Sequence, residues 1–241
     1  MDLNIGISRE LFIPPETRLV PAGAFLMGSE NGLPDERPVH AVVLDAFELA
    51  IYPVTNREYR IFLESTDSPP PSEWSNPLFN QPSQPVVSVT WHEARAYCQW
   101  LSDQSGTRYR LPTEAEREKA GRGGLEGSDY PWGEGIPETR PVRSTWNQKP
   151  DPVGKYPANG YGFYDLEGNV HEWCLDWYDL NYYSNSPKVN PKGAARGERK
   201  SSRGGAWRHS INISRCSARS SLPPDYRYND YGFRIVREII L

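Results

Sequence analysis

The chain has 241 residues, of which 37% are hydrophobic and 12% aromatic, and its formal net charge is -4. This charge gives no basic footprint for nucleic acid, and no apolar stretch approaches membrane-spanning length, so neither partner is expected. The 20 glycines and 23 prolines indicate a loop-rich globular domain rather than a low-complexity chain. A late run of basic residues is interpreted as a solvated loop: Arg196, Arg199, Lys200 and Arg203.

The three cysteines, Cys98, Cys174 and Cys216, are too few for a secreted disulfide framework, and their number is odd. Each stands in an apolar or aromatic setting, which is typical of a small core side chain. The first residues show no basic region followed by an apolar run, so no signal peptide is visible. These features predict a reduced, cytoplasmic protein.

Residues 1–17 are predicted to be an irregular N-terminal lead-in. Residues 18–241 are predicted to form a single domain, because no composition shift or internal repeat divides them. Residues 19–28 are expected to form a strand pair with a turn at Ala22-Gly23. Residues 39–52 alternate apolar and polar side chains and predict a strand that enters a tight turn at Pro53.

Three helices are predicted from one repeated pattern, in which a threonine is followed three positions later by a glutamate. The pairs are Thr55 with Glu58, Thr90 with Glu93, and Thr113 with Glu116. In such a capping box the hydroxyl accepts from a free backbone N–H, and the glutamate reaches back to the cap. Gly106 and Gly121 are the predicted helix stops. These acids are therefore assigned to capping rather than to catalysis.

Residues 122–158 are predicted to be mostly irregular. Residues 182–200 are rich in Asn, Ser, Pro and Gly and are expected to form an exposed loop. Short strands are expected around residues 204–207, 215–219 and 232–237.

Residues 159–178 are dense in Gly and aromatic side chains and set two carboxylates, Asp165 and Glu172, beside a glycine turn. Carboxylates and backbone carbonyls so close in sequence can make a hard-oxygen cage suited to Ca²⁺. The alternative interpretation is a surface turn with ordinary acids, since no EF-hand pattern is present.

Several motifs follow one another along the chain and together carry a family resemblance. They are Gly23-Ala-Phe-Leu-Met-Gly-Ser29, Tyr52-Pro-Val-Thr-Asn56, Pro85-Val-Val-Ser-Val-Thr-Trp91, Arg110-Leu-Pro-Thr-Glu-Ala-Glu116, Tyr130-Pro-Trp-Gly133, Gly160-Tyr-Gly-Phe-Tyr-Asp165, Gly168-Asn-Val-His-Glu-Trp173, Arg203-Gly-Gly-Ala-Trp207 and Gly232-Phe-Arg234. In this order, over residues 18–237, they resemble the formylglycine-generating enzyme family, also called sulfatase-modifying factors.

The resemblance implies one compact α+β domain of the C-type-lectin-like fold, loop-rich with few helices and short strands. It also implies a structural Ca²⁺ held by Asp165, Glu172 and the carbonyls of Gly168 and Val170. A second calcium site of the family would follow Trp146. Residues 146–153 offer only Asp151 as an acidic ligand, so we do not expect that second site.

The resemblance further implies a Cu(I) site of two thiolates in the true oxidases, which use O₂ to convert a substrate cysteine to formylglycine. Soft thiolates suit Cu(I). Here the first cysteine position is His209, and the second falls within residues 211–214, which hold no cysteine. The pocket serine is Ala206 and the pocket tryptophan is His171, while Cys216 matches a structural position. Formylglycine formation by the known mechanism is therefore not expected.

Three hypotheses for function remain open. The first is a binding module for a protein, peptide or small-molecule ligand, because Tyr, Ser, Asn and Arg give adaptable contact surfaces. Some relatives diversify this final segment, although its arginines and aromatics can instead anchor the fold. The residues expected to bind are Trp177, Trp207, Arg208, His209, Asn212, Tyr226, Tyr228, Asn229 and Tyr231.

The second hypothesis is a divergent metal-dependent oxidase or oxygenase that uses His171 and His209, because imidazole binds Zn, Cu, Fe and Ni. The alternative is that both imidazoles hydrogen-bond nearby carbonyls and carboxylates, since the sequence identifies no third ligand. The third hypothesis is a structural or regulatory partner domain, as cysteine-lacking members of the family suggest. Whether the chain is an enzyme therefore stays open, and the binding module is the hypothesis we favour.

Overall fold

The computed structural model describes residues 13–135 and 148–239. Its helices are α1 (Asn56–Thr66), α2 (Trp91–Ser105) and α3 (Glu114–Arg122), with 3₁₀ turns η1 (Pro34–Glu36), η2 (Tyr182–Asn185) and η3 (Ile211–Ile213). Its strands are β1 (Thr17–Val20), β2 (Gly23–Met27), β3 (His40–Leu44), β4 (Phe47–Ala50), β5 (Tyr109–Arg110), β6 (His171–Trp177), β7 (Lys200–Arg203), β8 (Arg219–Leu222), β9 (Tyr231–Gly232) and β10 (Val236–Arg237).

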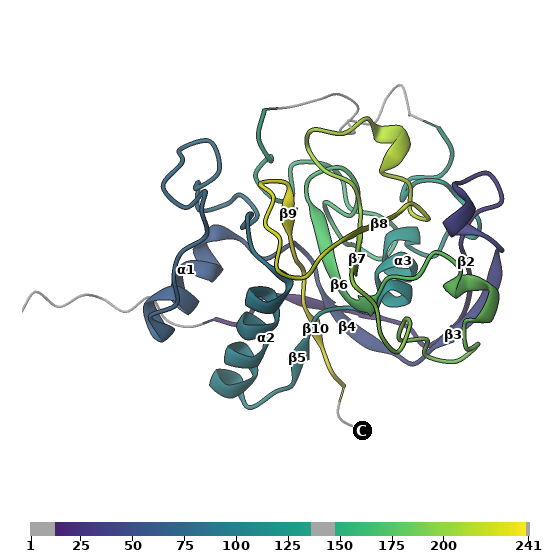
Figure 1. The fold of residues 1–241 in the computed structure, drawn as a ribbon, viewed down its shortest axis with the longest axis horizontal. Coiled ribbons are helices and arrows are strands. Elements are labelled where there is room, and N and C mark those ends of the chain that lie inside the picture. Colours follow the sequence, from purple (N-terminus) through teal and green to yellow (C-terminus); the bar gives the residue numbers. More distant parts are fainter. Residues whose placement is uncertain (1–12, 136–147, 240–241) are drawn as a thin grey trace, which may run out of the picture.

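The strands form three sheets, with orders β1-β4-β10-β5, β2-β3 and β8-β7-β6-β9. Within the third sheet β6 pairs parallel with β9 and antiparallel with β7. In Figure 1, α1 and α2 lie on one side of the molecule, whereas α3 lies beside the β8-β7-β6-β9 sheet. This arrangement confirms the predicted α+β class with few helices and short strands.

All three predicted capping boxes are present. Thr55, Thr90 and Thr113 each accept a hydrogen bond from the backbone N–H of the glutamate three positions later. Gly106 ends α2 with φ 69°, as predicted. The predicted stop at Gly121 is wrong, because α3 continues to Arg122 and Gly123 takes the left-handed conformation with φ 59°.

The predicted strands at the N-terminal end need correction. The strand pair expected over residues 19–28 consists of β1 and β2, but these strands belong to different sheets, because β1 pairs with β4 and β2 with β3. Residues 39–52 form two strands, β3 and β4, instead of one. Thr17 already pairs with Ala50, so the sheet starts inside the expected lead-in. Residues 1–12 of that lead-in lie outside the described residues.

The short strands expected near the C-terminus are found only in part. Residues 204–207 form a turn after β7, with Gly204 at φ 95° and Gly205 at φ 67°. Of residues 215–219, only Arg219 is in a strand, at the start of β8. The segment 232–237 provides the end of β9 and the whole of β10.

One core cluster contains a group of packed aromatic side chains beside aliphatic ones. Tyr59, Tyr97 and Phe233 are almost completely buried, and the ring of Tyr97 lies 5.7 Å from that of Tyr59 and 5.3 Å from that of Phe233. All three cysteines are free and buried. No helix among residues 13–135 and 148–239 is long and apolar enough to cross a membrane.

The expectation of a solvated basic loop is wrong for two of its members. Lys200 and Arg203 lie in β7 and are 3% and 1% exposed. Lys200 Nζ lies 4.0 Å from the ring centroid of Trp91 and 3.6 Å from that of Trp177, a double cation–π contact. Arg203 is paired with two buried carboxylates of α3, Glu114 at 3.0 Å and Glu118 at 2.5 Å. Aromatic rings around Lys200 and carboxylates around Arg203 therefore explain burial that the local sequence does not indicate.

Candidate functional site

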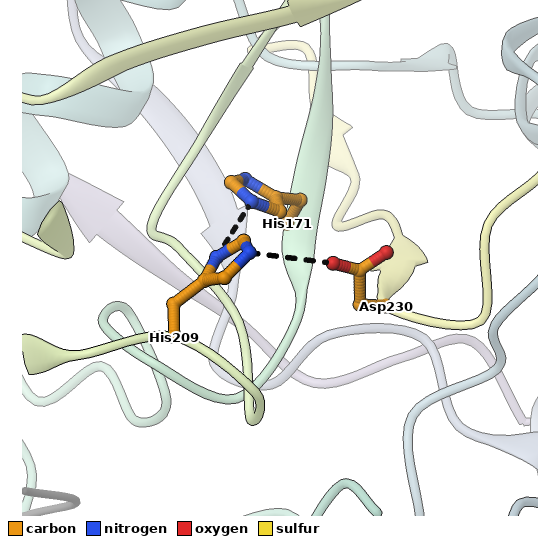
Figure 2. A group of neighbouring side chains, drawn as sticks. All are labelled: His171, His209 and Asp230. Atoms are coloured by element: carbon orange, nitrogen blue, oxygen red, sulfur yellow. Dashed lines mark hydrogen bonds and ion pairs between the residues drawn. The ribbon is translucent and has the colours of Figure 1, made fainter. Parts of the chain in front are cut away.

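Two histidines and an aspartate converge at one edge of the β8-β7-β6-β9 sheet. His171 Nε2 lies 3.2 Å from His209 Nδ1, and His209 Nε2 lies 3.9 Å from Asp230 Oδ2. One potential ligand atom from each residue lies within 4.8 Å of the others. Figure 2 shows the two imidazoles side by side and the Asp230 carboxylate pointing toward His209.

The backbone explains how residues so far apart in sequence meet. His171 is the first residue of β6, and its N–H donates to the carbonyl of Asp230 at 2.8 Å, next to the parallel pairing of His171 with Tyr231. The ring of Tyr231 stacks on that of His171 at 4.7 Å and fixes its plane. His209 follows the glycine turn after β7, and its N–H donates to the carbonyl of Ala206 at 2.9 Å.

The three side chains are unequally buried. Asp230 is 1% exposed and His171 is 6% exposed, whereas the side chain of His209 is 23% exposed. His171 Nδ1 and Asp230 Oδ1 are buried and find no hydrogen-bond partner among the described residues. Arg208 Nε donates to Asp230 Oδ2 at 2.7 Å. Buried polar atoms without partners are costly, so these two atoms point to something that binds here.

Electrostatics keep both imidazoles neutral near pH 7. Burial, together with the nearby His209 and Arg208, lowers the pKa of His171 to about 3. Burial also lowers the pKa of His209, although the Asp230 carboxylate opposes this shift. Neutral imidazole has a free lone pair, which is the form that binds metal ions.

A hollow of about 290 Å³ lies against these residues. Its walls include the exposed side chains of Tyr226 and Tyr228, together with Arg208, Ser220 and Ser221. Arg199 also reaches the hollow, where its Nε donates to Ser221 Oγ at 2.9 Å. The arrangement offers metal ligands, hydroxyl groups and two guanidinium groups to a molecule in the hollow.

Five of the nine residues predicted to bind ligand line this hollow: Arg208, His209, Tyr226, Tyr228 and Tyr231. Four do not, namely Trp177, Trp207, Asn212 and Asn229. Each of these four has a contact of its own. Trp177 packs against Lys200, Trp207 Nε1 donates to the Asn229 carbonyl at 3.2 Å, and the Asn212 carbonyl accepts from Arg215.

Asp230 is not predicted from the sequence as a metal ligand, and Arg199 is not predicted for the site. No spacing signal connects Asp230 with His171 or His209, because the parallel pairing of β6 with β9 and the antiparallel pairing of β6 with β7 bring the three residues together. The position of Asp230 directly before the short strand at Tyr231 is the one feature of the sequence that could have indicated a role in the site. Asp230 supplies the third ligand group that the metal hypothesis lacks.

The predicted calcium ligands have other partners. Both oxygens of Glu172 accept hydrogen bonds from buried arginines, Arg117 and Arg234. Asp165 Oδ2 accepts from the N–H of Gly154 at 2.7 Å. The assignment of Glu172 as a calcium ligand stays a prediction, and its single carboxylate already accepts hydrogen bonds from two guanidinium groups.

The second calcium site was not expected, and Trp146 lies outside the described residues. Asp151, the one acid expected near it, pairs with Lys155 Nζ at 2.9 Å and lies 3.3 Å from the hydroxyl of Tyr156.

The fold and the site define a loop-rich α+β domain with a polar pocket at a sheet edge. The chain belongs to the FGE-sulfatase family, described as "Sulfatase-modifying factor enzyme 1-like domain", which matches residues 8–239.

The relatives include the formylglycine-generating enzyme of Streptomyces coelicolor, 32% identical over 91% of this chain and 88% of the relative. "Serine/threonine-protein kinase pkn1" of Chlamydia caviae is 36% identical over 93% of this chain, which spans only 38% of that relative. Among solved structures, PvdO from Pseudomonas aeruginosa superposes with a TM-score of 0.83 at 30% identity, covering 93% of this chain and 95% of PvdO.

Proposed function

We propose that this domain is a ligand- or partner-binding module whose pocket is centred on a divalent transition metal held by His171, His209 and Asp230. The observation that carries the proposal is the convergence of these three ligand groups within 4.8 Å. Two neutral imidazoles and one carboxylate are donors that suit Zn²⁺, Fe²⁺ and Ni²⁺. His171 Nδ1 and Asp230 Oδ1 are buried without a hydrogen-bond partner among the described residues. A metal bound to the carboxylate and the imidazoles would satisfy this polar group of side chains and fix the orientation of the rings.

The proposed ligand is anionic. Three protein ligands leave metal positions open, as in metal sites that bind small molecules. Among the described residues, the hollow is lined by the basic side chains Arg199 and Arg208 and the two imidazoles. The one acid of the lining, Asp230, is buried and paired with Arg208. A small molecule or peptide with a carboxylate would thus find a metal and positive charge on one side, and exposed tyrosine rings on the other.

A second candidate function is a metal-dependent oxidase or oxygenase. It is favoured by the ligand set itself, because two histidines and one carboxylate with open positions are typical of non-haem Fe(II) oxygenases. Oxygen uptake by protein loaded with Fe²⁺, compared with protein loaded with Zn²⁺, separates this candidate from simple ligand binding.

Formylglycine formation, the activity in the name of several relatives, is not proposed for this chain. The hollow is lined by no cysteine, and all three cysteines of the chain are buried elsewhere. Cys216 Sγ, for example, contacts Glu167 at 3.6 Å. A Cu(I) dithiolate would need two thiolates in one pocket.

The test is elemental analysis of protein purified without chelators, followed by reloading with Zn²⁺ or Fe²⁺. The variant is His171→Ala/His209→Ala, and the matched control is His92→Ala, since the side chain of His92 is exposed and pairs with Asp225 at 3.3 Å. We expect close to one equivalent of transition metal in the wild type and the control, and almost none in the double variant. A wild type that stays free of metal after reloading would overturn the proposal.

A further inference from the structure

The loop of residues 165–172 is the place where the family resemblance puts a structural Ca²⁺. Such a site needs several oxygens that point at one hard cation and have no other partner. The expected set is Asp165, Glu172 and the carbonyls of Gly168 and Val170. Whether this set fits calcium depends on what these groups contact in the fold.

The Glu172 carboxylate is completely buried between two arginines. Arg117 Nε donates to Oε2 at 2.7 Å, and Arg234 donates to Oε2 through Nε and to Oε1 through Nη2, both at 3.0 Å. The side chains of Arg117 and Arg234 are 2% and 0% exposed. One carboxylate thus faces two guanidinium charges, so a divalent cation bound to it would meet strong repulsion.

The guanidinium of Arg117 also occupies the carbonyl side of the loop. Its Nη2 donates to the carbonyl of Leu166. A Cβ placed on Gly204 would lie 2.8 Å from this Nη2, 2.8 Å from the Leu166 carbonyl oxygen and 3.6 Å from that of Val170. The guanidinium head therefore lies beside the carbonyls that were expected to face the metal, in space that Gly204 leaves open.

Helix α3 holds Arg117 in this position. Every residue of α3 is buried, and Arg117 extends from the middle of the helix to Glu172, near the start of β6. On the other side of the loop, Asp165 stands at φ 55° and accepts from the Gly154 N–H, while the Gly168 N–H donates to the Gly204 carbonyl at 2.6 Å. The loop is thus closed by hydrogen bonds within the chain, and its donor set does not fit calcium.

We infer that Arg117 supplies, from within the chain, the positive charge that the family resemblance assigns to Ca²⁺ in this loop. The domain then folds without Ca²⁺ and keeps the same stability whatever the Ca²⁺ concentration. This inference is independent of the proposed transition metal, whose ligands are the imidazoles of His171 and His209 and the carboxylate of Asp230.

The test is thermal unfolding and calcium analysis of the full chain, after dialysis against EGTA and then against millimolar Ca²⁺. The wild type is expected to retain no stoichiometric Ca²⁺ and to show the same Tm in both buffers. One equivalent of bound Ca²⁺, or a Tm that falls in EGTA, would overturn the inference.

Variants at Arg117 test the role of the charge separately. Arg117→Met is expected to lower the Tm much more than Arg117→Lys, because only the lysine keeps a second cation, besides Arg234, next to Glu172. Arg122→Met is the matched control, since Arg122 is buried on the same helix and pairs with Glu118 at 2.7 Å. The Tm of Arg122→Met is expected to be the same in EGTA and in millimolar Ca²⁺. If Arg117→Met fails to fold, the Ca²⁺ content and the Tm of the wild type in the two buffers still test the inference. Equal Tm values for the lysine and methionine variants would contradict the inference.

Discussion

His171 Nε2 lies 3.2 Å from His209 Nδ1, although 38 positions separate the two residues in the chain. The contact joins the first residue of β6 to the turn that follows β7. Asp230 completes the group from the other side of β6, because β9 pairs parallel to it. The candidate site is therefore a product of three neighbouring strands and not of any local motif.

The carboxylate of the proposed metal site gives a first prediction. Asp230→Asn is expected to weaken metal binding by about tenfold or more, since a charged ligand becomes a neutral amide. The control is Asp225→Asn, because Asp225 is exposed and lies five positions before Asp230. Competition titration with a chromogenic chelator measures both affinities. Equal metal affinities in the two variants would show that Asp230 is not a metal ligand.

A second prediction concerns the chemistry of the family. The wild type, supplied with copper and O₂, is expected to leave a Cys-x-Pro-x-Arg peptide unchanged, because no cysteine lines the pocket. Mass spectrometry of the peptide measures the outcome. The Streptomyces coelicolor enzyme serves as the positive control in the same reaction. An aldehyde product from this chain would show that formylglycine formation survives without a thiolate pair in the pocket.

The acid stability of the fold depends on Glu114. Burial by itself would raise the pKa of this carboxyl, but Arg219 and Arg203 hold it at about 2, against 4.5 as the ordinary value. Because the unfolded state binds the proton more readily, this stabilisation is complete above pH 4.5 and is lost as the pH falls toward 2. Its size is on the order of 3 kcal/mol.

Glu114→Gln tests this dependence. The variant is expected to be less stable than the wild type at pH 7 by a few kcal/mol, because the buried Arg219 loses its carboxylate partner and Arg203 keeps only Glu118. It should also lose part of the decline in stability between pH 4.5 and 2. Urea unfolding at a series of pH values measures both effects. Parallel stability curves for the two proteins would show that Glu114 does not titrate in this range.

Two glycines that end helices form a matched pair. Gly106 and Gly123 both have left-handed backbones, at φ 69° and 59°. A Cβ at Gly106 meets nothing within 4 Å, whereas at Gly123 it would lie 2.8 Å from Asn159 Nδ2 and 3.0 Å from the Gly160 nitrogen.

Gly106→Ala is therefore expected to cost about 1–2 kcal/mol from backbone strain alone. Gly123→Ala should cost clearly more, about 3 kcal/mol in total, because the clash adds to the strain. Chemical denaturation gives the free energy of unfolding of each variant. Similar costs would mean that residues 159–160 move aside without penalty.

The sequence by itself determined the local features. The three helix starts could be predicted, because a capping box is a contact between residues three positions apart. The family and the α+β class followed from the motifs and their order along the chain. His171 and His209 could be placed at the pocket only by resemblance to the family.

The tertiary structure alone decided which distant groups meet. Asp230 joins the histidines because β6 and β9 pair in parallel, and Arg117 reaches Glu172 because α3 packs beside β6. The same cause buries Lys200 and Arg203, which local composition places in a solvated loop. A charged side chain can be buried when another element supplies an opposite charge or an aromatic ring next to it. The spacing of residues along the chain does not show which distant element supplies that partner.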